Sequence, residues 1–271
     1  MKNISLKEMQ KIELDLLMAL DTVCKKHGLR YYIDGGTLLG AMCYEGFIPW
    51  DDDIDLKMPR PDYERLKGLT HEFPPHIKVR FPAKDDCEYT FLKLIDTRTV
   101  LIEKTGNRTK RSGVYIDVLP MDGHPSDERE CARHLKKLGR LNTLFHSSFG
   151  RFEGMRSSKS TAVHIKGAVY ALIYTPWGLY KRLDRTAARY PYDGSARVGL
   201  LVEGDPVKER FEKEWLEPPI ELEFEGRMLP APPGYRRHME LFYGPHVTKP
   251  ECYHNLPRYP GNHEYTVYWK E

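Results

Sequence analysis

Four aspartates occupy five consecutive positions in the stretch DDDID, which ends at Asp55. Carboxylates packed this closely repel one another unless a cation or hydrogen-bond donors compensate them. If the residues from Asp53 onward form a strand, Ile54 and Leu56 point to one face. Asp53 and Asp55 then share the other face, with their Cα atoms about 7 Å apart. Two carboxylates at this spacing can bind one hard cation such as Mg²⁺, which prefers oxygen ligands.

The alternative for these residues is a solvated acidic turn. Taken alone, acidic turns are more common than metal sites. We favour the metal site because these residues lie inside a long intact motif over 34–66. Asp51 and Asp52 are assigned to the turn itself, as caps or as groups that orient the ligands. We therefore predict that Asp53 and Asp55, rather than their neighbours, bind the cation, either Mg²⁺ or Mn²⁺.

A third aspartate, Asp117, lies inside the apolar stretch GVYIDVLPM (113–121). One face of the predicted strand is apolar, and Asp117 lies on the other. A carboxylate in such a strand costs free energy unless it is paired or bound to a metal. Asp53, Asp55 and Asp117 would together form a triad suited to phosphoryl transfer, in which one or two cations neutralise phosphate oxygens. The alternative is a buried aspartate satisfied by backbone amides.

Gly35, Gly36 and Thr37 precede the acidic stretch. Two glycines allow the backbone to turn sharply and to approach a ligand closely. The N-terminus of a helix that follows them presents free N–H groups, which suit a phosphate. The pair matches neither common glycine-rich nucleotide-binding motif, so its significance comes from its place before the acidic strand.

Composition limits the class of protein. The chain has 271 residues and a net charge of +3, from 42 Lys and Arg against 39 Asp and Glu, which does not indicate a nucleic-acid partner. Its 5 cysteines are scattered and form no C-x-x-C pair, so we expect a reducing, cytoplasmic setting. The N-terminus lacks the apolar core of a signal peptide. The apolar stretch 167–180 is interpreted as a buried helix and turn, with a membrane-surface contact as the alternative.

Hydrophobic spacing predicts the helices that must position these residues. Apolar residues recur at helical spacing after Ser5, which forms an S-x-x-E capping box with Glu8. We therefore expect a helix over 6–27, ending near Gly28. A second helix is expected over 37–45, directly after the Gly-Gly turn.

The remaining segments mix strands with helices and show no steady βαβ alternation. This pattern predicts an α+β (mixed α/β) class with a helical middle segment from about 126 to 190. The stretch 103–113 is basic and turn-rich, and is predicted as a loop. Strands are expected over 30–34, 54–58, 77–81, 89–96, 113–121 and 197–204, with a strand-turn-strand over 219–233 and a helix over 234–244.

The longest motif, DGGTLLGAMCYEGFIPWDDDIDLKMPRPDYERL (34–66), resembles the LicD/fukutin-related phosphotransferase family of the nucleotidyltransferase superfamily. The resemblance continues over 91–99, 113–123 and 229–244, and is weakest between about 126 and 195. It implies a nucleotidyltransferase-like core with a small mixed sheet flanked by helices. The predicted division is a catalytic core over 1–125, a helical segment over 126–195, and a C-terminal part over 196–271 that packs on the core.

The resemblance also implies an activity. Such proteins transfer a phospho-alcohol, typically phosphocholine, from a CDP-activated donor to a sugar of a cell-surface glycan. The acceptor would be lipopolysaccharide, teichoic acid or a lipid-linked oligosaccharide, and the enzyme would be cytoplasmic, with a peripheral contact at the inner face of the membrane. The implied site residues are Asp53, Asp55 and Asp117 for the metal, Gly35, Gly36, Thr37 and Lys93 for the donor phosphates, and Asp117 or His263 as the base.

Several alternatives stay open at this point. The same triad could transfer a nucleotidyl group from a nucleoside triphosphate, or the chain could be a binding protein without activity. Phosphoethanolamine, ribitol phosphate and glycerol phosphate are alternative cargoes. Lys93 could be an ordinary strand lysine, and Cys43 stands where the family often has a basic residue. The sequence does not determine the oligomeric state.

Overall fold

The computed structural model describes residues 2–84, 86, 88–105, 108–148, 175–203, 208–249 and 264–270. The chain divides into two compact units, which are described separately. Unit 1 comprises Met1–Arg80, Lys93–Leu119 and Lys213–Glu271, and unit 2 comprises Phe81–Leu92 and Pro120–Glu212. The three-part division at 125/126 and 195/196 stays a prediction.

Unit 1 begins with the long helix α1 (Leu6–His27). The Ser5 side chain accepts a hydrogen bond from the Glu8 N–H, and the Glu8 carboxylate accepts one from the Ser5 N–H, which completes the predicted capping box. Gly28 ends the helix with φ of 60°, a left-handed conformation that favours glycine. Both predicted ends of this helix are confirmed.

The main sheet of unit 1 holds the candidate site. Its strands follow the order β1 (Tyr32–Ile33), β2 (Asp55–Pro59), β7 (Tyr115–Gly123), β4 (Leu92–Asp96) and β3 (Ile77–Arg80). Strand β1 pairs with β2, and β3 with β4, in antiparallel register. Helix α2 (Gly35–Tyr44) connects β1 to the loop before β2, and α3 (Arg60–Leu66) with the 3₁₀ helix η1 (Lys67–Glu72) follows β2.

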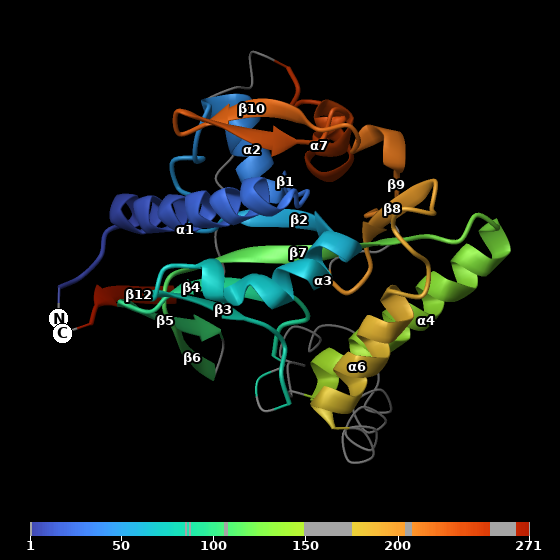
Figure 1. Cartoon of the computed structure of the whole chain (residues 1–271), viewed down its shortest axis with the longest axis horizontal. Coiled ribbons are helices and arrows are strands. Elements are labelled where there is room, and N and C mark those ends of the chain that lie inside the picture. The colour runs from blue at the N-terminus through green and yellow to red at the C-terminus, as the bar shows by residue number, and fades with distance from the viewer. Residues whose placement is uncertain are drawn as a thin grey trace. The chain divides into compact units, whose positions relative to one another are not determined.

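The predicted loop over 103–113 is wrong. Strands β5 (Thr99–Thr105) and β6 (Arg108–Ser112) pair there as an antiparallel hairpin, and β12 (Glu264–Trp269) pairs with β5 on its other side. Lys104 and Arg111 are exposed on these strands, and their charges obscured the alternation of side chains in the sequence. The two chain ends meet near this sheet, where the Trp269 N–H donates to the Lys2 carbonyl at 3.0 Å (Figure 1).

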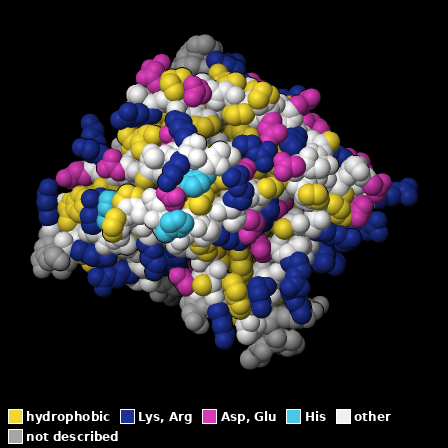
Figure 2. Space-filling view, viewed as in Figure 1, with side chains coloured by type: hydrophobic (Ala, Val, Ile, Leu, Met, Phe, Trp, Pro, Cys, Tyr) yellow, Lys and Arg dark blue, Asp and Glu magenta, His cyan; other side chains and the backbone are white. Residues whose placement is uncertain are grey.

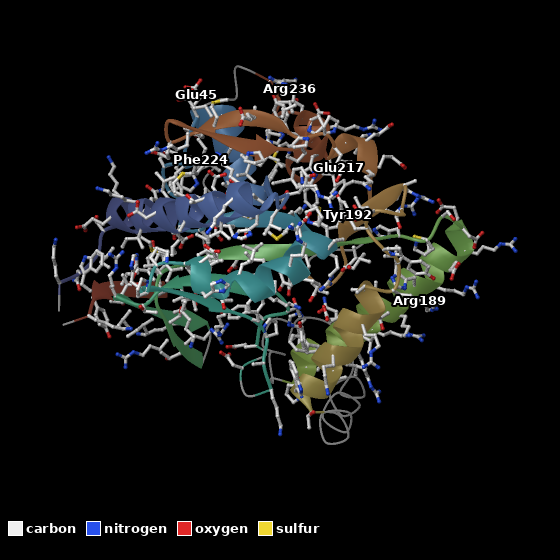
Figure 3. The ribbon with its side chains drawn as sticks, viewed as in Figure 1. Glu45, Arg189, Tyr192, Glu217, Phe224 and Arg236 are labelled. Carbon is white, nitrogen blue, oxygen red and sulfur yellow. The ribbon has the colours of Figure 1, made fainter. Side chains whose placement is uncertain are left out.

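The predicted strand-turn-strand and helix near the C-terminus are confirmed as β10 (Ile220–Phe224), β11 (Arg227–Ala231) and α7 (Tyr235–Tyr243), after the short β9 (Phe211–Glu212) and η3 (Lys213–Trp215). This hairpin supports the end of α2. The Glu225 N–H donates to the Glu45 carbonyl at 2.8 Å, and the Glu225 carboxylate accepts from the Phe47 N–H at 3.0 Å. The ring of Phe224, which is labelled in Figure 3, lies 4.9 Å from the ring of Phe47.

Unit 2 contains the predicted helical segment as α4 (Glu128–Ser148) and α6 (Pro176–Ala187), which lie side by side (Figure 1). Leu138, Leu183 and Ala187 pack together with Leu201 and Val202. Strand β8 (Arg197–Leu200) lies in the predicted strand 197–204, and pairs with β9 and with the last residues of β7. Together with unit 1, these elements confirm the mixed α/β class.

Among the described helices, none is long and apolar enough to cross a lipid bilayer.

Candidate active site

Three consecutive aspartates form a close group in the loop between α2 and β2. One carboxylate oxygen from each of Asp51, Asp52 and Asp53 lies within 4.8 Å of the others. Among the described residues, this is the group of three or more metal-ligating side chains whose ligand atoms come that close together. It includes Asp51 and Asp52, which were assigned to the turn and not to the metal. The parity prediction for Ile54 and Leu56 is confirmed, because both are fully buried.

The acidic loop is electrostatically strained. Desolvation by the surrounding protein, followed by repulsion from Asp51 and Asp52, raises the pKa of Asp53 to about 7. Desolvation and then Asp52 raise the pKa of Asp51 to about 6. The pKa of Asp55 is also well above its ordinary value, because the surrounding protein desolvates its carboxylate and Asp53 and then Asp117 repel its charge. The fold thus holds like charges together at the expense of their ionisation, which is typical of functional sites.

Gly35, Gly36 and Thr37, of which the glycines were predicted to form a turn before the helix, are instead the first residues of α2, and they pack directly against these aspartates. A Cβ on Gly36 would lie 2.5 Å from an Asp51 carboxylate oxygen, and Gly35, with φ of 53°, would place one 3.1 Å from Asp55. The Thr37 hydroxyl accepts a hydrogen bond from the Asp55 N–H at 3.0 Å. The three residues therefore position the acidic loop, and their contact with a donor phosphate stays a prediction.

Asp117 and Lys93 form a buried ion pair. The Lys93 ammonium donates to both Asp117 carboxylate oxygens, at 2.6 and 2.8 Å, and lies 3.5 Å from the centre of the Tyr115 ring. The Asp117 N–H donates to the Ile54 carbonyl at 2.9 Å, so β7 carries the third acid to the strand that follows the acidic loop. The structure thus brings Lys93 and Asp117 together, as expected of two site residues. Lys93 is a buried lysine and not an ordinary surface one.

A second buried ion pair, which the sequence analysis missed, lies behind the glycine turn. The Asp34 carboxylate contacts the Lys57 ammonium at 2.8 Å and the His238 ring at 2.9 Å. Burial acts to raise the pKa of Asp34, but Lys57 and then His238 outweigh it and hold that pKa well below its ordinary value. The signal was available, since Asp34 and Lys57 are charged residues inside predicted strands. Their pairing anchors the start of α2 to β2.

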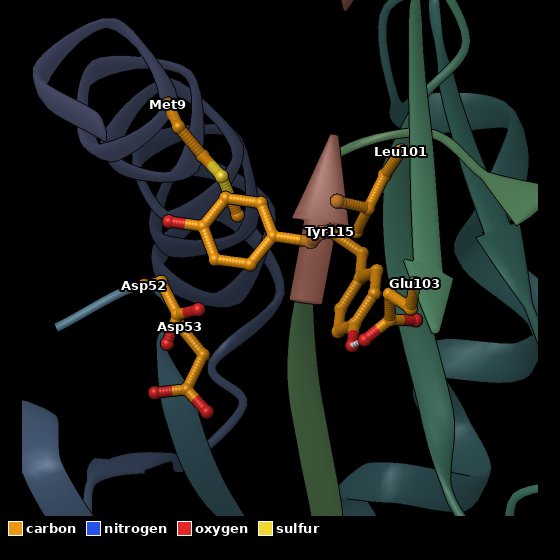
Figure 4. A pocket seen from close by; sticks show the side chains of 7 residues that line it. Met9, Asp52, Asp53, Leu101, Glu103 and Tyr115 are labelled. Carbon is orange, nitrogen blue, oxygen red and sulfur yellow. Dashed lines mark hydrogen bonds between the residues drawn. The ribbon is translucent and has the colours of Figure 1, made fainter. Parts of the chain in front are cut away.

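A small cavity of about 50 Å³ opens beside the acidic loop. Asp52 and Asp53 lie on one wall, and Glu103, hydrogen-bonded to the Tyr115 hydroxyl at 3.1 Å, lies on another (Figure 4). Met9 of α1 also lines it. The cavity is far smaller than ligand pockets of about 300–1,000 Å³, so it suits an ion and a few waters and not a whole nucleotide.

Two residues singled out from the sequence have different outcomes. Cys43 is buried, with its sulfur 3.9 Å from the Val247 carbonyl, so it packs inside unit 1. His263 lies outside the described residues.

Comparison with known proteins agrees with this geometry. Residues 28–136 match the model of the LicD/FKTN/FKRP nucleotidyltransferase domain. The chain is 29% identical to the lipopolysaccharide cholinephosphotransferase LicD of Haemophilus influenzae, over 92% of this chain and 94% of that protein. It is also 43% identical to human ribitol 5-phosphate transferase FKRP, over 17% of this chain and 10% of that protein.

A mixed sheet that carries an acidic loop beside a Gly-Gly helix start, within residues 28–136, defines a nucleotidyltransferase-type domain. Residues 28–136 therefore carry a LicD-type domain, and the chain as a whole is similar to the LicD/fukutin-related transferases, as its long motif predicted.

Proposed function

We propose that this chain is a metal-dependent phosphotransferase that moves a phospho-alcohol from a CDP-linked donor to a sugar hydroxyl of a cell-surface glycan. The observation that carries the proposal is the acidic loop packed on the glycine turn, inside a domain of this family. The cargo follows from the likeness over nearly the whole chain to a relative named as a lipopolysaccharide cholinephosphotransferase, so phosphocholine is favoured. Ribitol phosphate is the alternative, from the shorter match to FKRP.

The residues present fit a divalent cation. The clustered groups are all carboxylates, whose oxygen atoms Mg²⁺ and Mn²⁺ prefer, and the raised pKa values of Asp51 and Asp53 mark an uncompensated negative site. Asp53, Asp55 and Asp117 are proposed to hold one or two ions. When bound, the cation supplies positive charge that neutralises the donor diphosphate and the departing CMP.

The chain's own residues are proposed to bind and orient the reactants. Gly35 and Gly36 bring backbone N–H groups at the start of α2 to the donor phosphates, which favours anion binding. Lys93 orients the Asp117 carboxylate through its two hydrogen bonds. Asp117, or alternatively His263, accepts the proton of the attacking sugar hydroxyl. A general base must be held within hydrogen-bond reach of that proton, and the ion pair fixes Asp117 in place.

Product analysis tests this proposal against nucleotidyl transfer. The purified chain is incubated with Mg²⁺, an oligosaccharide acceptor and each of CDP-choline, CDP-ethanolamine, CDP-ribitol and CDP-glycerol. We expect CMP release that depends on the acceptor and is fastest with CDP-choline. Pyrophosphate release from CTP, without CMP release from any CDP-alcohol, would instead support nucleotidyl transfer. Binding of donors without any turnover would favour the non-catalytic alternative.

A basic face of unit 2 supports the expected peripheral contact with an anionic membrane or glycolipid acceptor. Lys and Arg side chains gather over α4 and α6 (Figure 2). On α4 they recur at the spacing of one helix face, and all of them are exposed. They are Arg129, Arg133, Lys136, Lys137 and Arg140 on α4, and Lys181, Arg182 and Arg185 on α6. Clusters of four or more such cations attract anionic lipid surfaces.

A further inference from the structure

Glu13 of α1 is a fully buried carboxylate without a hydrogen bond. Its exposed fraction is 0%, and neither carboxylate oxygen has a hydrogen-bond partner among the described residues. Burying an ionised carboxylate without a partner is strongly unfavourable, so such a group needs an explanation.

The same helix provides a second buried carboxylate for comparison. Asp21 is also buried, but its carboxylate accepts a hydrogen bond from the Tyr31 hydroxyl at 2.9 Å and pairs with Lys25 at 2.8 Å. Those contacts satisfy the charge within the protein. Glu13 lies two turns earlier on α1 and has no such contact, so its compensation must come from elsewhere.

Two neighbours on α1 show what Glu13 faces. Met9, one turn before it, lines the cavity together with Asp52 and Asp53. The Gln10 amide donates to the Asp51 carbonyl at 2.9 Å. Residues four apart share one face of a helix, so Glu13 projects from the face of α1 that lies over the acidic loop. In agreement, after desolvation the charges that raise the pKa of Glu13 most are Asp53, Asp52 and Asp51.

We propose that Glu13 is an additional carboxylate of the cation site, acting with the proposed ligand Asp53 in holding a divalent ion. This inference rests on the metal dependence of the proposed function, and adds a ligand from outside the matched domain, because α1 ends before residue 28. It explains why an apolar helix face retains a glutamate that would otherwise oppose folding.

The test is a titration with Mn²⁺ of the wild-type chain, Glu13→Gln and Asp21→Asn, followed by electron paramagnetic resonance of the free ion. Glu13→Gln keeps the side-chain volume and removes the charge, so we expect Mn²⁺ binding about tenfold weaker or more. Asp21→Asn removes a buried charge from the same helix and should bind Mn²⁺ like the wild type. Equal Mn²⁺ affinity of wild type and Glu13→Gln would overturn the proposal.

The melting temperature, measured with and without Mn²⁺, distinguishes a loss of metal binding from a folding defect. Without metal, Glu13→Gln should melt at a higher temperature than the wild type, because repulsion in the acidic site is relieved, and Mn²⁺ should raise its melting temperature less. If Glu13→Gln does not fold, the proposal is overturned, since the charge is then needed without metal. Wild-type Mn²⁺ binding without CMP release would refute the proposed function and leave this inference standing, whereas a wild type that binds no Mn²⁺ refutes the inference.

Discussion

The acidic loop of unit 1 and the basic face of unit 2 are both dense clusters of like charge, but they differ in how closely other groups of the protein surround the charges. Glu13 is fully buried and Asp51 is half-buried, and desolvation with mutual repulsion raises the pKa values of Glu13, Asp51 and Asp53. The cations of α4 and α6 are exposed, where water and salt screen their repulsion. Charge density alone therefore does not identify a site. A cluster that the fold holds together despite desolvation does, because it needs a ligand to compensate it.

The strongest test of this comparison is the substitution Asp53→Asn. If the acidic loop holds the catalytic cation, this substitution should lower the rate of CMP release by about a hundredfold to a thousandfold, because a preorganised charge contact at the reacting phosphate is lost. The fold should remain intact, as judged by circular dichroism. Asp15→Asn, on the exposed face of α1, is the control and should retain its rate. Full activity of Asp53→Asn would refute the assignment of this residue.

Buried and exposed ion pairs extend the comparison to stability. Asp34→Asn leaves the Lys57 ammonium buried without its carboxylate, so we expect the free energy of unfolding to fall by about 3–5 kcal/mol. In unit 2, Glu128 pairs with Arg210 at 3.0 Å while its side chain is 65% exposed, and Glu128→Gln should cost at most about 1 kcal/mol. Urea unfolding measures both. Similar losses for the two variants would contradict the distinction between the pairs.

Substitution of glycine by alanine should have opposite effects on stability at a closely packed position and at an open helix position. A Cβ on Gly36 would meet Asp51 at 2.5 Å, whereas one on Gly139 of α4 would meet nothing within 4 Å. Gly36→Ala should therefore destabilise the chain by about 1–3 kcal/mol and weaken Mn²⁺ binding. Gly139→Ala should stabilise it by up to about 1 kcal/mol, because alanine favours a helix. Thermal unfolding with and without Mn²⁺ distinguishes the outcomes, and a neutral Gly36→Ala would contradict the close packing.

The fold and part of the site could be predicted because they follow from local patterns. Ser5, Glu8 and Gly28 mark the ends of α1 in the sequence, and the alternation of Ile54 and Leu56 predicted two buried residues where the chain enters β2. The hairpin at 103–113 was missed because its basic side chains resemble those of a loop. Its strand character depends on pairing with β12, which comes from the distant end of the chain.

Contacts between distant segments limited the prediction of the site. The pairing of Asp34 with His238, and of Lys93 with Asp117, depends on strand order, which spacing does not give. Glu13 was different, because it stands in the apolar stripe of a predicted helix, four residues after Met9. A charged residue in such a stripe is a detectable signal. The sequence does not distinguish Glu13 from Asp21, however. The difference is seen only in the structure, where the Glu13 carboxylate has no hydrogen-bond partner among the described residues.

The metal-free protein should show an inverted dependence of stability on pH. The pKa of Asp53 is raised from 3.8 to about 7, so the folded state binds more protons than the unfolded state between these values. Stability from this group is present below about pH 4 and is lost as the pH rises through about 7. Urea midpoints at several pH values measure the trend. Asp53→Asn should make stability depend less on pH over this range. The assigned direction would be contradicted if, in EDTA, stability rose steadily with pH and Asp53→Asn showed the same rise.

The smallest effect on stability is expected at the basic face, where charges are solvated. Replacing Lys136 and Arg140 together by Glu should change the free energy of unfolding by less than about 0.5 kcal/mol, because both are exposed. Binding to vesicles that contain anionic phosphatidylglycerol should nevertheless fall severalfold in sedimentation assays, and CMP release with a soluble acceptor should be unchanged. Lys7→Glu with Lys11→Glu on α1 makes the same charge change in unit 1 and is the control. Equal loss of vesicle binding in both double variants would show that net charge, and not this face, governs the contact.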